Sequence, residues 1–349
     1  MPPPDPTAAR ADTALEGFLS RALARPGPFV LTTLAGGASP RRFFRIELGD
    51  GARAVVMQVP EDTPDVVFAR ERGRPWPFLE VRELLEGAGV RVPRLLAADT
   101  NAGFLLVEDL GETLAEHLVA RPGDREALYQ RAAHGLAQAQ RALDPLPEGS
   151  VTRERAFDES LYTLELEHFW EWGLVARGLA PDGRAGFDRA RDFLVRTLSA
   201  LPRGFCHRDY QSRNLMVVRD ASGELDLAWI DFQDALLGPR AYDLVALLCD
   251  SYQPYDRGFV ERRLDDYARE RALTDTARSE LGHEFDLIAV QRKLKDAGRF
   301  VFIEKKRGDS SFLRFVDPTL AIVADTLERL RDVPELAALA ELVRTAQGR

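Results

Sequence analysis

The feature that most constrains this chain is a polar loop between two apolar segments, at residues 205–217, followed by a second apolar segment that ends in Asp231 and Phe232. Asp209 can accept the proton of an attacking hydroxyl group. Asn214, five residues later, can turn back and hold a divalent metal through its amide oxygen, and Asp231 adds a carboxylate after a short hairpin. A metal that bridges phosphate groups offsets the charge that develops during phosphoryl transfer. The spacing therefore predicts a phosphoryl-transfer site, in which His207 holds the loop by hydrogen bonds.

Composition excludes several classes of protein. The chain has 349 residues, of which 45% are hydrophobic and 30% charged, as in an ordinary globular protein. Its net charge of −9 argues against a nucleic-acid-binding protein. The two cysteines, Cys206 and Cys249, cannot form a zinc finger. No apolar run is long enough to cross a membrane, and the first residues do not resemble a signal peptide. We expect a cytoplasmic monomer with a disordered tail over residues 1–12.

The hydrophobic pattern divides the chain into a β-rich first part and a mainly helical second part. In the first part, helices are expected over 12–24 and 78–88, and strands over 29–34, 43–48, 54–59 and 103–110. After Gly111 the pattern is mainly helical, with helices expected over 125–141, 157–173, 186–200, 242–251, 259–273, 285–302 and 318–331. We therefore expect an α+β protein with domains at residues 13–110 and 111–349.

The motifs resemble those of the aminoglycoside phosphotransferase superfamily along nearly the whole chain. The resemblance looks closest to the anomeric kinases of N-acetylmuramate and N-acetylglucosamine. It lies in residues 55–57, 60, 165–166, 169, 171–172, 207–217, 230–235, 238–239, 242–244, 291–292 and 295. It implies a protein-kinase-like two-lobed fold, with a small β-rich N-lobe and a larger, mainly helical C-lobe. By this resemblance Asp209 is the catalytic base, Asn214 and Asp231 are the metal ligands, and the cofactors are ATP and Mg²⁺.

The first domain is expected to bind the nucleotide. Most kinases hold the phosphates with a lysine on the third strand, but no lysine precedes Lys293 in this chain. Arginine can replace it because a guanidinium grips phosphate with two hydrogen bonds. Arg41 and Arg42 would point to opposite faces of a strand, so one of them should face the phosphates. The predicted nucleotide contacts are Gly37, Ser39, Arg41, Arg42 and, at a hinge whose backbone bonds adenine, Glu108 and Leu110.

The second domain is expected to bind the acceptor. Glu165, Phe169 and Trp172 are spaced to share one face of a helix, where they form either core or a sugar-binding surface. Arg213 precedes Asn214 and could contact phosphate or sugar, whereas Asp234 could join the metal shell or bind an arginine. Asp243 is expected to be structural.

The expected activity is ATP-dependent phosphorylation of the anomeric hydroxyl of an N-acetylated amino sugar, giving a sugar 1-phosphate in cell-wall recycling. Alternatives are a kinase of another small hydroxyl compound (an aminoglycoside, a choline-like alcohol or a lipid alcohol) and a pseudokinase that holds nucleotide without catalysis. The intact Asp209, Asn214 and Asp231 argue against the pseudokinase.

Overall fold

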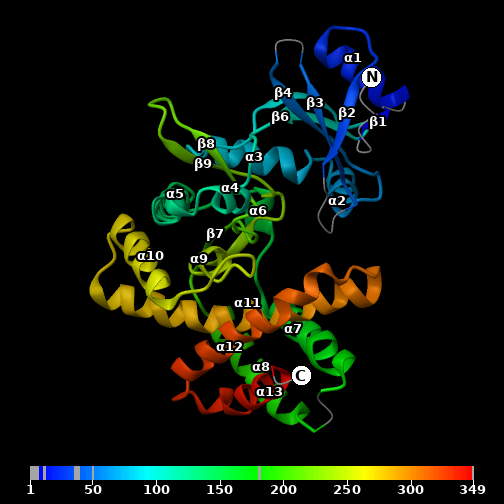
Figure 1. The fold of residues 1–349 in the computed structure, drawn as a ribbon. Coiled ribbons are helices and arrows are strands. Elements are labelled where there is room, and N and C mark those ends of the chain that lie inside the picture. The colour runs from blue at the N-terminus through cyan, green and yellow to red at the C-terminus, as the bar shows by residue number, and fades with distance from the viewer. Residues whose placement is uncertain (1–7, 11–12, 35–39, 49–50, 180–181, 348–349) are drawn as a thin grey trace. The chain divides into compact units, whose positions relative to one another are not determined.

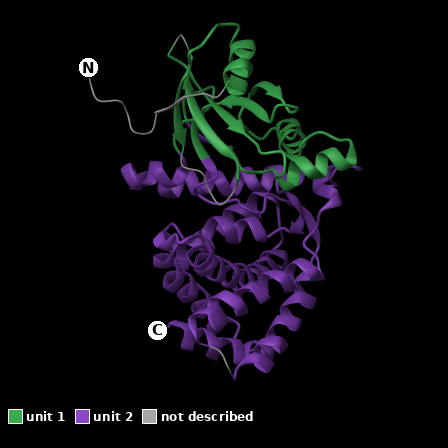
Figure 2. Ribbon diagram, turned by 90° about the vertical axis from the view of Figure 1, so that its right-hand side faces the viewer, with its two compact units in different colours: residues 1–112, 216–224, 228–233 green, residues 113–215, 225–227, 234–349 purple. Residues whose placement is uncertain are grey.

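The computed structural model describes residues 8–10, 13–34, 40–48, 51–179 and 182–347. Figure 1 shows the elements along the chain, and Figure 2 colours two compact units. Unit 1 contains residues 1–112, 216–224 and 228–233, and unit 2 contains 113–215, 225–227 and 234–349. The first division falls two residues after the domain boundary expected from the sequence, but part of a later hairpin also belongs to unit 1. Within the described residues, no helix combines the length and the apolar character that a membrane crossing requires.

Unit 1 is built on a six-stranded antiparallel sheet with the strand order β1-β2-β3-β4-β6-β5. The strands are β1 (Ala8–Arg10), β2 (Val30–Leu34), β3 (Arg42–Glu47), β4 (Arg53–Gln58), β5 (Leu95–Asp99) and β6 (Phe104–Glu108). Residues 8–10 pair with β2, although the sequence placed residues 1–12 in a disordered tail. The remainder of that tail, residues 1–7 and 11–12, lies outside the described residues.

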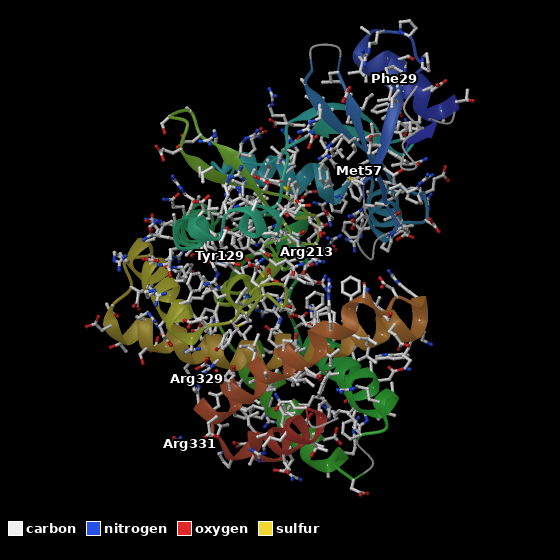
Figure 3. All side chains as sticks on the ribbon, in the orientation of Figure 1. Phe29, Met57, Tyr129, Arg213, Arg329 and Arg331 are labelled. Atoms are coloured by element: carbon white, nitrogen blue, oxygen red, sulfur yellow. The ribbon has the colours of Figure 1, made fainter. Side chains whose placement is uncertain are left out.

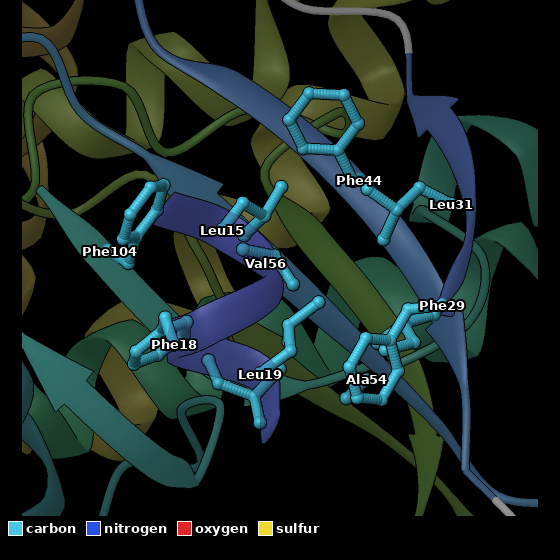
Figure 4. Packing of buried hydrophobic residues seen from close by; sticks show 11 residues of the cluster. Leu15, Phe18, Leu19, Phe29, Leu31, Phe44, Ala54, Val56 and Phe104 are labelled. Atoms are coloured by element: carbon cyan, nitrogen blue, oxygen red, sulfur yellow. The ribbon is translucent and has the colours of Figure 1, made fainter. Parts of the chain in front are cut away.

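Helices cover both faces of the sheet. Neighbouring residues of a strand point to opposite faces, so each face carries side chains that pack against these helices. Phe44 joins a buried cluster with α1 (Thr13–Leu23), whereas Phe43 packs on the opposite side, near Met57 and Trp76. Figure 4 shows the α1 cluster, in which Phe18 stacks on Phe104 with ring centroids 5.4 Å apart.

Two helices, α2 (Pro64–Arg72) and α3 (Pro77–Gly87), follow β4. The sequence analysis assigned no helix to residues 64–72. The start of α2 is nonetheless a common type of helix N-terminus, because Thr63 at the N-cap is extended and Pro64 occupies the first turn. The helix ends at Gly73, whose φ of 61° is the left-handed conformation that glycine favours.

Unit 2 is mainly helical. Its helices are α4 (Leu114–Ala120), α5 (Arg125–Ala142), α6 (Val151–Glu154), α7 (Glu159–His168), α8 (Arg184–Ser199), α9 (Tyr242–Leu248), α10 (Arg257–Glu270), α11 (Asp275–Arg307), α12 (Val316–Arg329) and α13 (Ala337–Gln347). The long helix α11 runs through the unit, and it contacts α7, α8, α9, α10 and α12 (Figure 1). Short 3₁₀ turns lie at Pro122–Asp124 (η1), Val175–Arg177 (η3), Ser310–Phe315 (η4) and Pro334–Leu336 (η5).

Two short two-stranded sheets flank the polar loop of the sequence motif. β7 (Arg203–Cys206) pairs with β10 (Leu236–Pro239), and β8 (Leu215–Arg219) pairs with β9 (Leu225–Trp229). Gly238 is needed in the first pair, since a Cβ there would lie 2.9 Å from the Cβ of Cys206. The polar loop thus spans residues 207–214, between β7 and β8.

The helix expected over residues 157–173 changes type partway. The α-helix α7 ends at His168, and Phe169–Leu174 form a π-helix, η2. Gly173 makes room for the Phe169 ring in this segment, because a Cβ on Gly173 would lie 2.3 Å from that ring. The expected continuous α-helical face is therefore wrong beyond His168.

Candidate active site

The start of the loop of residues 207–214 is held by a buried carboxylate, Asp243. Asp243, in the first turn of α9, accepts hydrogen bonds from the backbone N–H of His207 (2.7 Å) and of Arg208 (2.9 Å). Arg208 has a φ of 77°, a left-handed conformation that is costly for a residue with a side chain. Because Asp243 binds the N–H groups of His207 and Arg208, it holds the chain that leads into this strained residue and helps to fix the direction of the next residue, Asp209. These contacts agree with the structural role expected for Asp243.

Asp209 is partly exposed, with 37% of its side chain accessible. Arg292 of α11 reaches it with Nη2 3.4 Å from Oδ1, and the same guanidinium donates to the Arg208 carbonyl at 2.8 Å. Burial by itself would raise the pKa of Asp209, but the nearby cations Arg292, Lys295 and Arg208 outweigh it, and the pKa is lowered. The carboxylate is therefore ionised at neutral pH, and it can accept a hydrogen bond from a hydroxyl group.

Asn214 has a defined orientation. Its Nδ2 donates to the backbone carbonyl of Asp209 at 2.8 Å, so the amide oxygen points away from that bond. The preceding part of the loop is anchored by Asp250, which accepts from the backbone N–H of Ser212 at 2.9 Å. An amide oxygen is a suitable ligand for Mg²⁺, and the residue fits the role predicted for it.

Asp231 belongs to unit 1, whereas Asp209 and Asn214 belong to unit 2. It is exposed, has a φ of 61°, and accepts a hydrogen bond from Nε2 of Gln233 at 2.8 Å. The next residue, Phe232, is fully buried and stacks on Phe78 of α3 with ring centroids 5.1 Å apart. The buried ring fixes the backbone after β9, and the left-handed turn presents the carboxylate to solvent.

The predicted acceptor residues have different environments. Glu165 is buried and accepts from Nε2 of Gln291 at 2.8 Å, with Arg208 3.8 Å away. Phe169, the first residue of η2, is fully buried and its ring packs against Gly173. It therefore offers no surface to a sugar. Trp172 is half-buried and meets Phe302 edge to face at 5.1 Å.

The two remaining acceptor candidates are charged. Arg213, labelled in Figure 3, lies 3.6 Å from the centre of the Tyr252 ring. Asp234 is half-buried, and its carboxylate is close enough to Arg208 to favour the charged form of that guanidinium.

On the nucleotide side, the two candidate arginines differ. Arg41 forms an ion pair with Asp65 of α2, and both line a small cavity with Met57, Val59, Trp76 and Leu105. Arg42 starts β3, is exposed, and lies 5.0 Å from the centre of the Phe44 ring. Arg41 therefore lies beside Met57 of β4, on the face where α2 packs. Gly37 and Ser39 lie outside the described residues.

The predicted hinge contains one occupied and one open backbone position. The N–H of Glu108 donates to the Arg94 carbonyl at 2.9 Å, and its carboxylate binds Arg91 at 2.6 Å. The backbone of Leu110 makes no hydrogen bond to any residue that the structure describes. Asp109, between them, is bound by Arg45 at 2.6 Å. Of the two predicted positions, Leu110 is thus the one whose backbone is open to a ligand.

Several residues that shape these sites carried no usable signal in the sequence. Asp65 and Asp109 are single carboxylates at the start of a helix and just after a strand, and their arginine partners, Arg41 before β3 and Arg45 within it, are 24 and 64 residues away. Arg292 was noted only as part of the family resemblance. A cationic side chain on the apolar face of a buried helix could have marked it as the partner of a carboxylate.

Comparison with known proteins identifies the relationship. Residues 30–280 match the model of the phosphotransferase enzyme family. The chain is 34% identical over 338 residues to the N-acetylmuramate/N-acetylglucosamine kinase of Pseudomonas aeruginosa, covering 94% of this chain and 92% of that protein. It is 33% identical over 328 residues to the protein of the same name from Neisseria meningitidis, covering 90% and 91%.

Solved structures support the fold. An ADP-bound aminoglycoside phosphotransferase superposes with a TM-score of 0.59 at 16% identity, covering 90% of this chain and 99% of that one. Plasmodium vivax ethanolamine kinase gives 0.54 at 12% identity, covering 85% and 82%. The kinase-like fold predicted from the sequence is confirmed. The chain is an ATP-dependent kinase, and it belongs to the phosphotransferase enzyme family.

Proposed function

We propose that the chain transfers the γ-phosphate of ATP to the anomeric hydroxyl of an N-acetylated amino sugar, giving the sugar 1-phosphate. The observation that carries the proposal is the similarity to enzymes named N-acetylmuramate/N-acetylglucosamine kinase, which extends over 94% of the chain. The loop around Asp209 adds chemical support, because an ionised, partly exposed carboxylate on a clamped loop is suited to accept the proton of a sugar hydroxyl.

In the proposed mechanism, Asp209 orients the sugar hydroxyl by accepting its hydrogen bond and takes its proton as the sugar oxygen bonds to the γ-phosphorus. The bond from that phosphorus to the bridging oxygen of ATP breaks, and ADP leaves. Arg292 holds the carboxylate and the preceding carbonyl, so it acts as a positioning residue. Asn214 and Asp231 would hold Mg²⁺, because both supply the oxygen atoms that this ion prefers. When bound, Mg²⁺ would neutralise part of the phosphate charge.

The nucleotide would be held by unit 1. Arg41 supplies positive charge near Met57, on the strand where other kinases carry a lysine, and Asp65 orients its guanidinium. The backbone of Leu110 is the proposed contact with the adenine edge. Gly37 and Ser39 stay predicted phosphate contacts.

The product would be an activated sugar phosphate, which a nucleotidyltransferase could consume in the recycling of cell-wall sugars. We propose that the enzyme acts as a monomer in the cytoplasm, where ATP is abundant. A nucleotide-binding role without catalysis is disfavoured because Asp209, Asn214 and Asp231 are all present.

The test is a coupled ADP-release assay on N-acetylmuramate, N-acetylglucosamine, their 1-O-methyl glycosides, an aminoglycoside and choline. The free sugars should be phosphorylated, and the methyl glycosides should be inert because their anomeric oxygen carries no proton. The product should lose its phosphate in mild acid, as glycosyl phosphates do. Equal turnover of the methyl glycosides would place the reaction at another hydroxyl, and activity on choline or the aminoglycoside alone would reject the sugar.

A further inference from the structure

One face of α11 carries a row of cationic and aromatic side chains that continues away from Asp209. After Arg292, which binds Asp209, the row contains Lys295, Arg299, Phe302 and Lys306. Their spacing of three or four residues places them on one side of the helix. With a rise of ~1.5 Å per residue, Arg299 lies on the order of 10 Å along the axis from Arg292. Figure 1 shows α11 passing beside α7 within unit 2.

This row faces His168 and Trp172, from the end of α7 and from η2. The Phe302 ring lies 5.3 Å from the imidazole of His168 and 5.1 Å from the indole of Trp172. Arg299 lies 5.0 Å from the Phe302 ring, and Lys306 lies 5.2 Å from the Trp172 ring. The approach is close because Gly298 of α11 lies against the backbone of His168 and Phe169. The result is a half-buried pair of aromatic rings, the indole of Trp172 and the phenyl of Phe302, with cations at its edges.

Arg299 is unusual within this group. It is half-buried, yet it forms no hydrogen bond or ion pair with any residue in the described part of the chain. Arg257, another half-buried arginine of unit 2, has a carboxylate partner in Asp286 at 2.7 Å. Burial and the neighbouring Arg307 lower the pKa of Arg299, whereas Asp209 opposes this shift. A partly buried charge without a counter-ion is costly, and an anionic ligand would remove that cost.

Two neighbours support an anionic ligand. Nε2 of His168 is buried and has no hydrogen-bond partner among the described residues. Burial, with Arg299 and Lys295 nearby, lowers the pKa of His168 to about 4, so the ring is neutral at pH 7 and can still donate or accept one hydrogen bond. Lys295 is bound by Asp296 at 3.0 Å and retains two further N–H groups.

We propose that Arg299, assisted by Lys295, binds a carboxylate of the acceptor sugar, and that Trp172 and Phe302 pack against its apolar surface. This inference rests on the proposed function. It assigns N-acetylmuramate as the preferred acceptor, since this sugar differs from N-acetylglucosamine by an acidic lactyl ether a few bonds from the anomeric carbon. The row of cations also disfavours a polycationic acceptor.

The experiment compares kcat/KM for the two sugars in the wild type, Arg299→Gln and Lys305→Gln. Lys305 lies on the same helix but off the row, is exposed, and carries the same charge, so it controls for loss of net charge. Arg299→Gln should lower kcat/KM for N-acetylmuramate by at least ~10-fold, the usual loss for a charged hydrogen bond, and that for N-acetylglucosamine by less than ~3-fold. Lys305→Gln should change neither.

The methyl ester of N-acetylmuramate supplies a test that needs no folded variant. The wild type should use this uncharged ester as poorly as Arg299→Gln uses the acid, and the variant should not distinguish ester from acid. Equal use of ester and acid by the wild type, or equal losses on both sugars in Arg299→Gln, would overturn the inference while leaving the sugar kinase intact. A wild type that phosphorylates neither sugar would overturn the proposed function and this inference together.

Discussion

Gly298→Ala should destabilise the protein even though alanine is the better helix former. An added Cβ at this position of α11 would lie 2.9 Å from Cα of Phe169 and 3.0 Å from the carbonyl oxygen of His168. Both are backbone atoms, so no side chain can rotate to make room. Overpacking of this kind costs ~1–3 kcal/mol. Replacing a helical glycine by alanine contributes about 1 kcal/mol in the opposite direction. Because the opposing atoms belong to the backbone, the upper part of the overpacking range applies. We therefore expect the free energy of unfolding to fall by ~1–2 kcal/mol.

Gly282→Ala supplies a matched control in the same helix. The nearest atom to a Cβ at Gly282 is Nη1 of Arg278, at 3.3 Å, and the end of an arginine side chain can move away. We expect this variant to gain ~0.5–1 kcal/mol from helix propensity alone. The two variants should therefore differ by roughly 1.5–3 kcal/mol, and at about 2 °C per kcal/mol for a large domain their Tm values should differ by ~3–6 °C.

The assay is thermal unfolding of the two variants and the wild type, combined with KM for the sugar. Gly298→Ala should also raise the sugar KM, because the displaced backbone carries His168 and the neighbouring Trp172, whereas Gly282→Ala should leave it unchanged. Equal or higher stability of Gly298→Ala relative to Gly282→Ala would refute the close packing of α11 on the junction of α7 and η2.

Three further predictions concern the nucleotide, the base and pH. Asp209→Asn should lower kcat by at least ~10²-fold while nucleotide binding, measured by calorimetry, stays near wild type. Arg41→Ala should weaken ATP use by ~1.5–3 kcal/mol in kcat/KM, whereas the exposed Arg42→Ala should be mild; equal effects would show that Arg41 does not replace the lysine. Because the pKa of His168 is lowered to about 4, the unfolded chain binds the extra proton first as pH falls. Stability should therefore decrease from about pH 6.5 towards pH 4, and His168→Gln should lose this part of the decrease in pH-dependent urea unfolding.

The order of the polar residues was sufficient to predict the family and the kinase-like fold. The spacing from Asp209 to Asn214 and Asp231 is set by the need to bring a base and metal ligands together for phosphoryl transfer. Phe43 and Phe44 pack on opposite faces of the sheet because neighbouring residues of a strand point in opposite directions. Both are local properties, so they can be read without a structure. The helix α2 was missed because its apolar residues, 66–69, are consecutive and do not show the helical period, and because its start depends on Pro64.

The contacts that depend on folding could not be predicted. Glu165, Phe169 and Trp172 were expected on one α-helical face, but η2 turns Phe169 into the interior and leaves Trp172 half-buried against Phe302. That outcome depends on Gly298, which lies 129 residues later in the chain and leaves room for the Phe169 backbone. No periodicity in residues 165–172 carries this information.

The charges around Asp209 bear on which acceptor of this family the chain can use. A polycationic aminoglycoside requires carboxylates around the reacting hydroxyl, whereas here α11 brings Arg292, Lys295 and Arg299 to the neighbourhood of Asp209. Two of the nearby carboxylates are already bound, Glu165 by Gln291 and Asp296 by Lys293 and Lys295. The acidic net charge of the whole chain therefore does not describe this site. Because like charges at short range are repulsive, the local charge favours a neutral or anionic sugar over an aminoglycoside.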